Sequence, residues 1–405
     1  MTNQHVLEGV TVLDFTQYLA GPTSTRALAQ MGATVIKVEL PPVGDMSRLV
    51  PVIKDGRSAF YMQHNRGKQS LGLNVRDPRG REILRALIPK VDVLVENYSP
   101  GVIARHGLDW ETVHALNPRL VMCSISGFGQ QGPLSQMRGF DFVCAGYAGV
   151  LGMFGYPDRP PVSPPASVGD VATGMNAAAA IGGALYRALR TGEGQYIDTS
   201  LLDAYFNMND AGVEMYSASG GRQLLTRSGS HHALLAPAGV FRGPGGDVVI
   251  FSISPAQWVG LCEAMGRPEL AADPRFADHP SRIANLQAMV AAVEQWMEGQ
   301  TSVEQVVALL QEHGVPCGPV LDMAQATEHP HVKARRMVHS LHDERLGEFK
   351  VPAPPFRFSG VPDPPALQAP VLGQHNEVIL RTYLNYSPAQ VRELAQAGVL
   401  LSGKV

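Results

Sequence analysis

The fold class is decided by residues 7–41, whose sequence is LEGVTVLDFTQYLAGPTSTRALAQMGATVIKVELP. Residues 10–15 have the pattern of a buried strand, and Pro22 suits the first turn of a helix that runs to about Met31. Gly32 suits the C-terminal cap of that helix, and residues 33–38 form the next strand pattern. This order of strand, helix and strand predicts a parallel α/β sheet with right-handed crossovers.

The same alternation continues along the chain. Asp77 followed by Pro78 predicts the start of another helix, and residues 91–95 and 120–125 are further strand patterns. Residues 174–190, GMNAAAAIGGALYRALR, predict a long helix with one nearly smooth face. Such a face indicates close packing against another backbone. The run is too short and too polar at its ends for a membrane span.

The later part of the chain predicts a smaller α+β unit. A strand pattern covers residues 248–252, and helical patterns cover 255–265 and about 282–310. The region from about 205 to 235 gives no clear pattern. A proline-rich segment at 351–370 predicts little regular structure.

Composition narrows the possible partners and compartment. The chain has 405 residues and a formal net charge of -3, so no basic excess points to nucleic acid or to an anionic membrane surface. The N-terminus lacks a signal-peptide pattern, and no apolar run approaches a membrane span. The four cysteines lie far apart, which predicts neither a metal centre nor a disulfide framework and suits the reducing cytoplasm.

Two motifs suggest chemistry but lack the context for it. Residues 127–132 match GxGxxG, yet Pro133 follows, no helix is predicted to open there, and the preceding strand is not the first of the sheet. We therefore do not expect dinucleotide binding and interpret the motif as a glycine-rich turn. His329 and His331, and the adjacent His231 and His232, have no acidic or cysteine ligands at usable spacing, so no metal site is expected.

Asp170 is the strongest candidate for a reactive group. It lies in SVGDVATG, residues 167–174, where a loop becomes the long helix. A carboxylate there gains from the helix dipole and from free backbone N–H groups. It can be a helix cap, or it can be a nucleophile that is kept ionised near hydrogen-bond donors.

Motifs along essentially the whole chain, including the one that contains Asp170, occur in the order found in the family III CoA-transferases, which the chain resembles. This group includes formyl-CoA transferase, carnitine CoA-transferase and α-methylacyl-CoA racemase. Besides residues 7–41, the resemblance is carried by NRGKQSLGLN (65–74), VENYSPGVIARHGL (95–108), NPRLVMCSISGFGQQGP (117–133), VGDVATGMNA (168–177), TGEGQYID (191–198), HGVPCGPVLDMAQA (313–326) and LGQHNEVIL (372–380).

The resemblance implies a doubly wound, Rossmann-like large domain and a smaller α+β domain, in an interlocked homodimer. Residues 1–205 would form the N-terminal part of the large CoA-binding domain, and residues 206–328 the linker and small domain. Residues 329–405 would return to the large domain.

The resemblance also implies the chemistry. Asp170 matches the catalytic aspartate, which attacks an acyl-CoA and carries CoA as an aspartyl thioester, with no metal and no tightly bound cofactor. Coenzyme A and acyl-CoA are substrates. Backbone N–H groups near Gly169 and in the glycine-rich turn are candidate oxyanion donors.

Several positions match the CoA site of the family. They are Ala20, Asn97, Tyr98, Arg105 and Arg138. Arginine suits the diphosphate and 3'-phosphate of CoA, although each arginine alone would be a solvated surface charge. The basic position after the second strand is Leu40 here, which puts one phosphate contact in doubt.

The departures from the family select among its activities. The histidine and glutamate that a racemase needs fall on Phe140 and Gly239, so we expect a transferase. Leu19 replaces the glutamine of formyl-CoA transferase, and its long glycine-rich flap is absent, so formyl-CoA and oxalate are disfavoured.

The segment at 228–237, SGSHHALLAP, resembles that of relatives acting on itaconate, mesaconate, citramalate or malate with succinyl-CoA as donor. His231 and His232 are candidate contacts to the distal carboxylate, or structural loop histidines. Carnitine, bile-acid or aromatic substrates, or acyl-CoA binding without turnover, remain alternatives.

Overall fold

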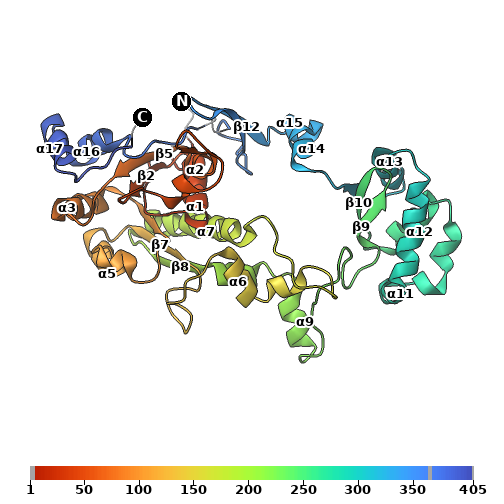
Figure 1. Ribbon diagram of the computed structural model, residues 1–405. Helices are drawn as coiled ribbons and strands as arrows, with labels where there is room; N and C mark the ends of the chain where they lie inside the picture. The colour runs from red at the N-terminus through yellow and green to blue at the C-terminus, as the bar shows by residue number, and fades with distance from the viewer. Residues whose placement is uncertain (1–4, 364–366, 404–405) are drawn as a thin grey trace. The chain divides into compact units, whose positions relative to one another are not determined.

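The computed structural model describes residues 5–363 and 367–403, and its chain divides into two compact units (Figure 1). The first unit joins Met1–Ala148, Pro165–Met208 and His331–Val405, and the second joins Gly149–Pro164 and Asn209–Pro330. The short segment 149–164, which the sequence analysis placed in the large domain, therefore groups with the second unit.

A parallel sheet forms the centre of the first unit. Among the described residues it has six strands, which lie in the order β5 (Lys68–Gly72), β2 (Thr34–Glu39), β1 (Thr11–Asp14), β6 (Val93–Glu96), β7 (Val121–Ser126) and β8 (Tyr196–Ser200). Numbered along the chain, this order is 3-2-1-4-5-6, the doubly wound arrangement. The strand order reverses between β1 and β6, which makes their carboxyl ends the expected place for a ligand.

Helices cover both faces of this sheet. Val12, Val95 and Ile125 point to the face covered by α1 (Ala20–Gln30) and α7 (Val168–Thr191). Leu13, Leu94 and Met122 point to the opposite face. The helices there are α3 (Pro78–Leu87), α4 (Val102–Arg105), α5 (Trp110–Leu116), α16 (Asn376–Leu384) and α17 (Pro388–Gln396).

The predicted helix boundaries have clear local causes. Met31 caps α1 and is followed by Gly32 at φ +102°, in the left-handed region that glycine adopts readily. The side chain of Asp77 accepts a hydrogen bond from the backbone N–H of Arg79 and caps α3.

Close packing between α1 and α7 explains the small residues of the long helix. A Cβ at Gly174 would collide with the carbonyl oxygen of Ala20 and lie 2.7 Å from Cβ of Thr23. Gly174 therefore lets α7 approach α1 closely, as the smooth face predicted. This contact fixes the N-terminal end of α7 beside the first residue of α1.

The remaining elements of the first unit are short. They are the hairpin of β3 (Ile53–Lys54) and β4 (Arg57–Ser58), the helices α2 (Ala59–Asn65), α6 (Asp141–Tyr147) and α8 (Leu201–Asn207), and the hairpin of β12 (Val338–Asp343) and β13 (Gly347–Pro352). Helix α15 (Pro330–Ala334) lies at the boundary between the units.

The second unit has its own apolar core. Its antiparallel sheet has the order β11 (Cys317–Pro319), β10 (Gly246–Phe251) and β9 (Ala238–Gly243). Its helices are α9 (Gly212–Ala218), α10 (Pro255–Ala264), α11 (His279–Ala284), α12 (Leu286–Glu298), α13 (Val303–Glu312) and α14 (Met323–Glu328). The helical pattern predicted for about 282–310 is thus divided, because Gly299 ends α12 and the Ser302 side chain caps α13.

Three further observations concern the described residues only. None of their helices has the length and apolar character needed to cross a membrane. No group of three or more metal-ligating side chains comes together in the described ranges. All four cysteines are free thiols.

Candidate active site

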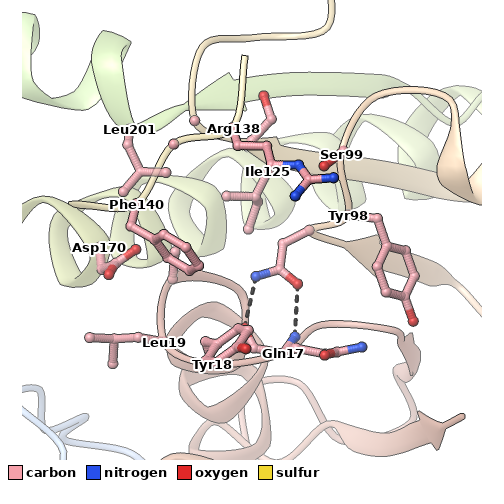
Figure 2. A pocket seen from close by; sticks show the side chains of 15 residues that line it. Gln17, Tyr18, Leu19, Tyr98, Ser99, Ile125, Arg138, Phe140, Asp170 and Leu201 are labelled. Atoms are coloured by element: carbon pink, nitrogen blue, oxygen red, sulfur yellow. Dashed lines mark hydrogen bonds between the residues drawn. The ribbon is translucent and has the colours of Figure 1, made fainter. Parts of the chain in front are cut away.

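A cavity of about 290 Å³ lies at the carboxyl ends of the central strands, where the strand order reverses. Its walls come from the loops that follow β1, β6 and β7, together with residues from α7 and α8 (Figure 2). The lining residues are Gln17, Tyr18, Leu19, Ala20, Asn97, Tyr98, Ser99, Ile125, Ser126, Gly127, Arg138, Gly139, Phe140, Asp170 and Leu201.

Asp170 enters this cavity from the first turn of α7 (Figure 2). The N-cap residue of α7 is Ser167, whose own side chain makes no capping hydrogen bond. Asp170 is therefore not the N-cap, which removes the plainer of the two interpretations of this residue. Its carboxylate faces a cavity and is available for chemistry.

A second carboxylate lies beside the same helix end. Asp141 is only 3% exposed, and its Oδ1 accepts a hydrogen bond of 2.6 Å from the Tyr205 hydroxyl. The Tyr205 hydroxyl in turn accepts a bond of 3.3 Å from the backbone N–H of Gly169. A Cβ at Gly169 would collide with the Tyr205 ring and with Asp141 Oδ1, so only glycine fits next to Asp170.

These neighbours give Asp170 an unusual acidity. Burial, and after it the charge of Asp141, raises the pKa of Asp170 to about 7. This direction is opposite to the one expected from the helix terminus alone, because desolvation and a nearby like charge outweigh the dipole. Burial raises the pKa of Asp141 too, while its hydrogen bond from Tyr205 lowers it.

The structure brings together most of the residues expected to bind CoA. Ala20, Asn97, Tyr98 and Arg138 all line the cavity that contains Asp170. Ala20 is the first residue of α1, and Arg138 is exposed at the cavity (Figure 2). Arg105 is exposed at the end of α4 and does not line this cavity.

Two aromatic rings form part of the cavity wall. Tyr18 and Phe140 meet edge to face with centroids 5.9 Å apart, and Phe140 is 65% exposed. Both rings line the cavity that contains Asp170 (Figure 2). Phe140 occupies the position of a racemase histidine, so an apolar ring stands where a proton-transfer group would be needed.

The two candidate substrate histidines belong to the second unit. His232 Nδ1 accepts hydrogen bonds from the backbone N–H groups of Leu234 and Leu235, so this ring holds its own loop together. His231 Nδ1 is buried and has no partner among the described residues. Burial lowers the pKa of His231.

Gly239 is tightly enclosed by the His231 loop. A Cβ at Gly239 would lie 2.6 Å from His231 Nδ1 and would collide with the Ser230 carbonyl oxygen. The glutamate of a racemase therefore does not fit at this position.

The glycine-rich turn serves to shape the loop after β7. No helix opens within it, as expected, because the next one is α6 at Asp141. The N–H of Gly129 donates to Ser126 Oγ, and that of Gln130 donates to the Asp198 carboxylate. Gly169 N–H also has a partner, so the N–H groups of Gly129, Gln130 and Gly169 are not free oxyanion donors in this structure.

Sequence reasoning missed the Asp141–Tyr205 pair and the wall formed by Tyr18. The two members of the pair are 64 residues apart, so no local pattern joins them. The wall at Tyr18 depends on a left-handed backbone at φ 64°, which a tyrosine rarely adopts and a sequence pattern does not reveal.

Comparison with known proteins gives a consistent result. A family model described as CoA-transferase family III matches residues 7–376. The chain is 33% identical to human succinyl-CoA:glutarate CoA-transferase, over 99% of this chain and 91% of the relative. It is 34% identical to formyl-CoA:oxalate CoA-transferase of Streptomyces coelicolor, over 97% and 99%.

Another relative and a solved structure agree. The chain is 35% identical to succinyl-CoA–D-citramalate CoA-transferase of Chloroflexus aurantiacus, over 93% of this chain and 94% of the relative. The crystal structure of a CAIB/BAIF family protein from Brucella suis has a TM-score of 0.82 and 34% identity, and covers 94% of this chain and 100% of its own.

Proposed function

Since the chain belongs to CoA-transferase family III, we propose that it moves CoA from succinyl-CoA to a short dicarboxylic acid through an aspartyl-CoA thioester on Asp170. The observation that carries this proposal is that the Asp170 carboxylate, which is not the N-cap of α7, faces a cavity at the switch point of the sheet. Covalent transfer needs such a nucleophile next to a binding cavity.

The proposed reaction proceeds through two anhydrides. The ionised Asp170 carboxylate attacks the thioester carbonyl of succinyl-CoA, and the C–S bond breaks to release CoA thiolate. The thiolate attacks the aspartyl carbonyl of the mixed anhydride, which forms aspartyl-CoA and releases succinate. The acceptor carboxylate then attacks aspartyl-CoA and expels the thiolate again. Attack of the thiolate on the acceptor acyl carbonyl gives the new acyl-CoA and restores Asp170.

The choice of acceptor rests on the relatives and on the second unit. Glutarate, oxalate and citramalate, which the names of the relatives give, are all dicarboxylic acids. We keep itaconate, mesaconate, citramalate and malate as the candidate acceptors. Of the two histidines, His231 is the better candidate for the distal carboxylate. The Nδ1 atom of His232 already accepts two N–H bonds from its own loop, whereas Nδ1 of His231 has no partner among the described residues.

The proposed CoA contacts follow the cavity. Ala20 and Tyr98 would contact the thioester end of CoA, since they line the same cavity as Asp170, and Asn97 lies in the same wall with both amide atoms bonded to Gln17. Arg138 is an exposed guanidinium at its edge, suited to a phosphate. Arg105 is outside the cavity wall and would meet only the distant phosphates of CoA.

A homodimer is part of the proposal, and α7 offers the surface for it. One side of α7 carries apolar residues that are exposed or half-buried in the single chain, which are Val168, Val171, Met175, Ala179, Gly182, Tyr186 and Leu189. An uncovered apolar stripe of this length is typical of an interface. The free thiols of all four cysteines agree with the proposal that the protein functions in the reducing cytoplasm.

The test is to trap the intermediate. Incubation with succinyl-CoA followed by hydroxylamine should convert Asp170 to its hydroxamate, which peptide mass spectrometry detects. Asp170→Ala should bind CoA normally but exchange nothing. Failure of every acyl-CoA tried to label Asp170 would exclude this mechanism. A panel of free acids, followed through the CoA products by mass spectrometry, would separate dicarboxylates from carnitine, bile-acid and aromatic acceptors.

A further inference from the structure

The turn at residues 16–18, between β1 and α1, forms one wall of the cavity and is held by side chains from elsewhere in the sheet. Lys37 Nζ donates to the Thr16 carbonyl oxygen at 2.6 Å, and Asp45 Oδ1 accepts from the Tyr18 N–H at 3.1 Å. Backbone groups that would otherwise bind water in a mobile loop thus have fixed partners.

Asn97 completes this set. Its Oδ1 accepts from the Gln17 N–H at 2.7 Å, and its Nδ2 donates to the Gln17 carbonyl oxygen at 2.8 Å (Figure 2, dashed lines). The amide therefore pairs with Gln17 as a neighbouring strand would. This arrangement uses the side chain of Asn97 to support the turn, although its position matches a CoA contact of the family.

Lys37 and Asp45 form a buried ion pair. Their side chains are fully buried, and Nζ and Oδ2 lie 2.9 Å apart. Buried ion pairs add little net stability compared with apolar packing, because both charges must leave water. A gain in overall stability therefore explains this ion pair poorly. A role in fixing the position of the turn explains it better.

The conformation that these residues hold is a strained one. Tyr18 has φ 64°, in the left-handed region that non-glycine residues avoid. Such strain persists where surrounding contacts over-determine it, and it is concentrated at functional sites. Here it directs the Tyr18 ring to its edge-to-face contact with Phe140 in the cavity wall.

We propose that Lys37, Asp45 and Asn97 are positioning residues, which hold the turn at 16–18 in its CoA-binding conformation before CoA arrives. Asn97 acts mainly through the Gln17 backbone. The proposal rests on CoA binding in this cavity, as proposed above. Its physical basis is that a wall fixed in advance lowers the entropy lost on binding.

Two variants loosen the turn by different routes. Asn97→Ala removes both bonds to Gln17 from a half-buried position. The double variant Lys37→Met, Asp45→Asn removes the buried charges together, so neither is left unpaired. The control is Arg282→Met, which removes another buried cation that donates to backbone carbonyl oxygens. Arg282 belongs to the second unit, where it donates to the carbonyl oxygens of Ala236 and Phe276.

The measurements separate this proposal from the function on which it rests. Hydrogen exchange of the free protein should show faster exchange for the peptide that contains residues 16–18 in both loosened variants, and not in Arg282→Met. Calorimetry should show CoA affinity reduced roughly tenfold in the same two, with kcat changed less than about threefold. The control should keep its CoA affinity within about twofold, whatever its melting temperature.

Other outcomes would overturn the proposal. Unchanged exchange at residues 16–18 excludes the positioning role without reference to CoA. Weaker CoA binding in Asn97→Ala alone would show that Asn97 contacts CoA directly. An equal loss of affinity in Arg282→Met would show a general effect of removing a buried polar group. Absence of CoA binding by the unaltered protein, with the exchange result as expected, would refute the proposed function instead.

Discussion

In the proposed reaction the Asp170 carboxylate must be ionised to attack a thioester, and its pKa of about 7 places this ionisation in the neutral range. Roughly a tenth of the carboxylate is ionised at pH 6, and roughly nine-tenths at pH 8. The rate of aspartyl-CoA formation at low succinyl-CoA concentration should therefore rise about tenfold between these two pH values. An aspartate with its ordinary pKa of 3.8 would show a flat profile there.

Asp141→Asn tests the cause of this acidity. Asparagine has nearly the same shape, and its amide oxygen can still accept the hydrogen bond from Tyr205. It carries no charge, so the pKa of Asp170 should fall toward its ordinary value and the rate profile should move to lower pH.

The assay is a quenched time course of aspartyl-CoA on the enzyme, quantified by mass spectrometry across this pH range. CoA phosphates also titrate, but they do so equally with both proteins, so the difference between the two profiles belongs to the enzyme. A flat profile for the unaltered protein would show that Asp170 is already ionised. Coincident profiles for the two proteins would show that Asp141 does not influence it.

Three further outcomes follow from the same contacts. Asp170→Asn should raise stability at pH 8, because the pKa of Asp170 is higher in the folded state. The protonated carboxyl's contribution is full below pH 3.8 and is lost as the pH rises through about 7, at most about 4 kcal/mol; equal melting temperatures of the two proteins at pH 8 would contradict this. Gly169→Ala should lower the free energy of unfolding by about 1–3 kcal/mol and kcat by at least about tenfold, since its Cβ collides with the Tyr205 ring; CoA affinity measured by calorimetry should stay, and an unchanged kcat would argue against a role for this contact. Gly239→Glu should give no exchange of the α-proton with deuterium and a lower melting temperature, because a side chain there meets His231; deuterium incorporation would reopen the racemase interpretation.

The sequence was most informative where local and global preferences agree. Buried strands such as β6, VLVE, and β7, VMCSIS, consist mainly of apolar residues, so their pattern predicts a parallel sheet directly. The strand β5, KQSLG, was not predicted. Its polar residues are buried by distant partners, with Lys68 paired to Asp14 and Ser70 bound to Glu39, and a pattern based on hydrophobicity excludes such a strand.

The site divides in a similar way. Asp170 could be found because its motif is continuous and sits at a helix start. Its raised pKa could not be predicted, because that depends on burial and on the charge of Asp141, which only the folded chain brings beside Asp170. Arg105 shows a limit of reasoning from motifs. Its position was carried over from a family motif, but Arg105 does not line the cavity of this chain.

The raised pKa of Asp170 also bears on the direction of the proposed reaction. In the mixed anhydride, CoA thiolate can attack either carbonyl, and the carboxylate with the lower pKa leaves more easily. Because burial next to Asp141 raises the pKa of Asp170, Asp170 is a poorer leaving group than an ordinary carboxylate such as succinate. Attack at the aspartyl carbonyl, with loss of succinate, is therefore favoured over return to succinyl-CoA. In the proposed reaction the same preference favours aspartyl-CoA when the anhydride forms with the acceptor. The burial that lowers the ionised fraction of Asp170 would thereby direct both anhydrides toward the intermediate that hydroxylamine would trap.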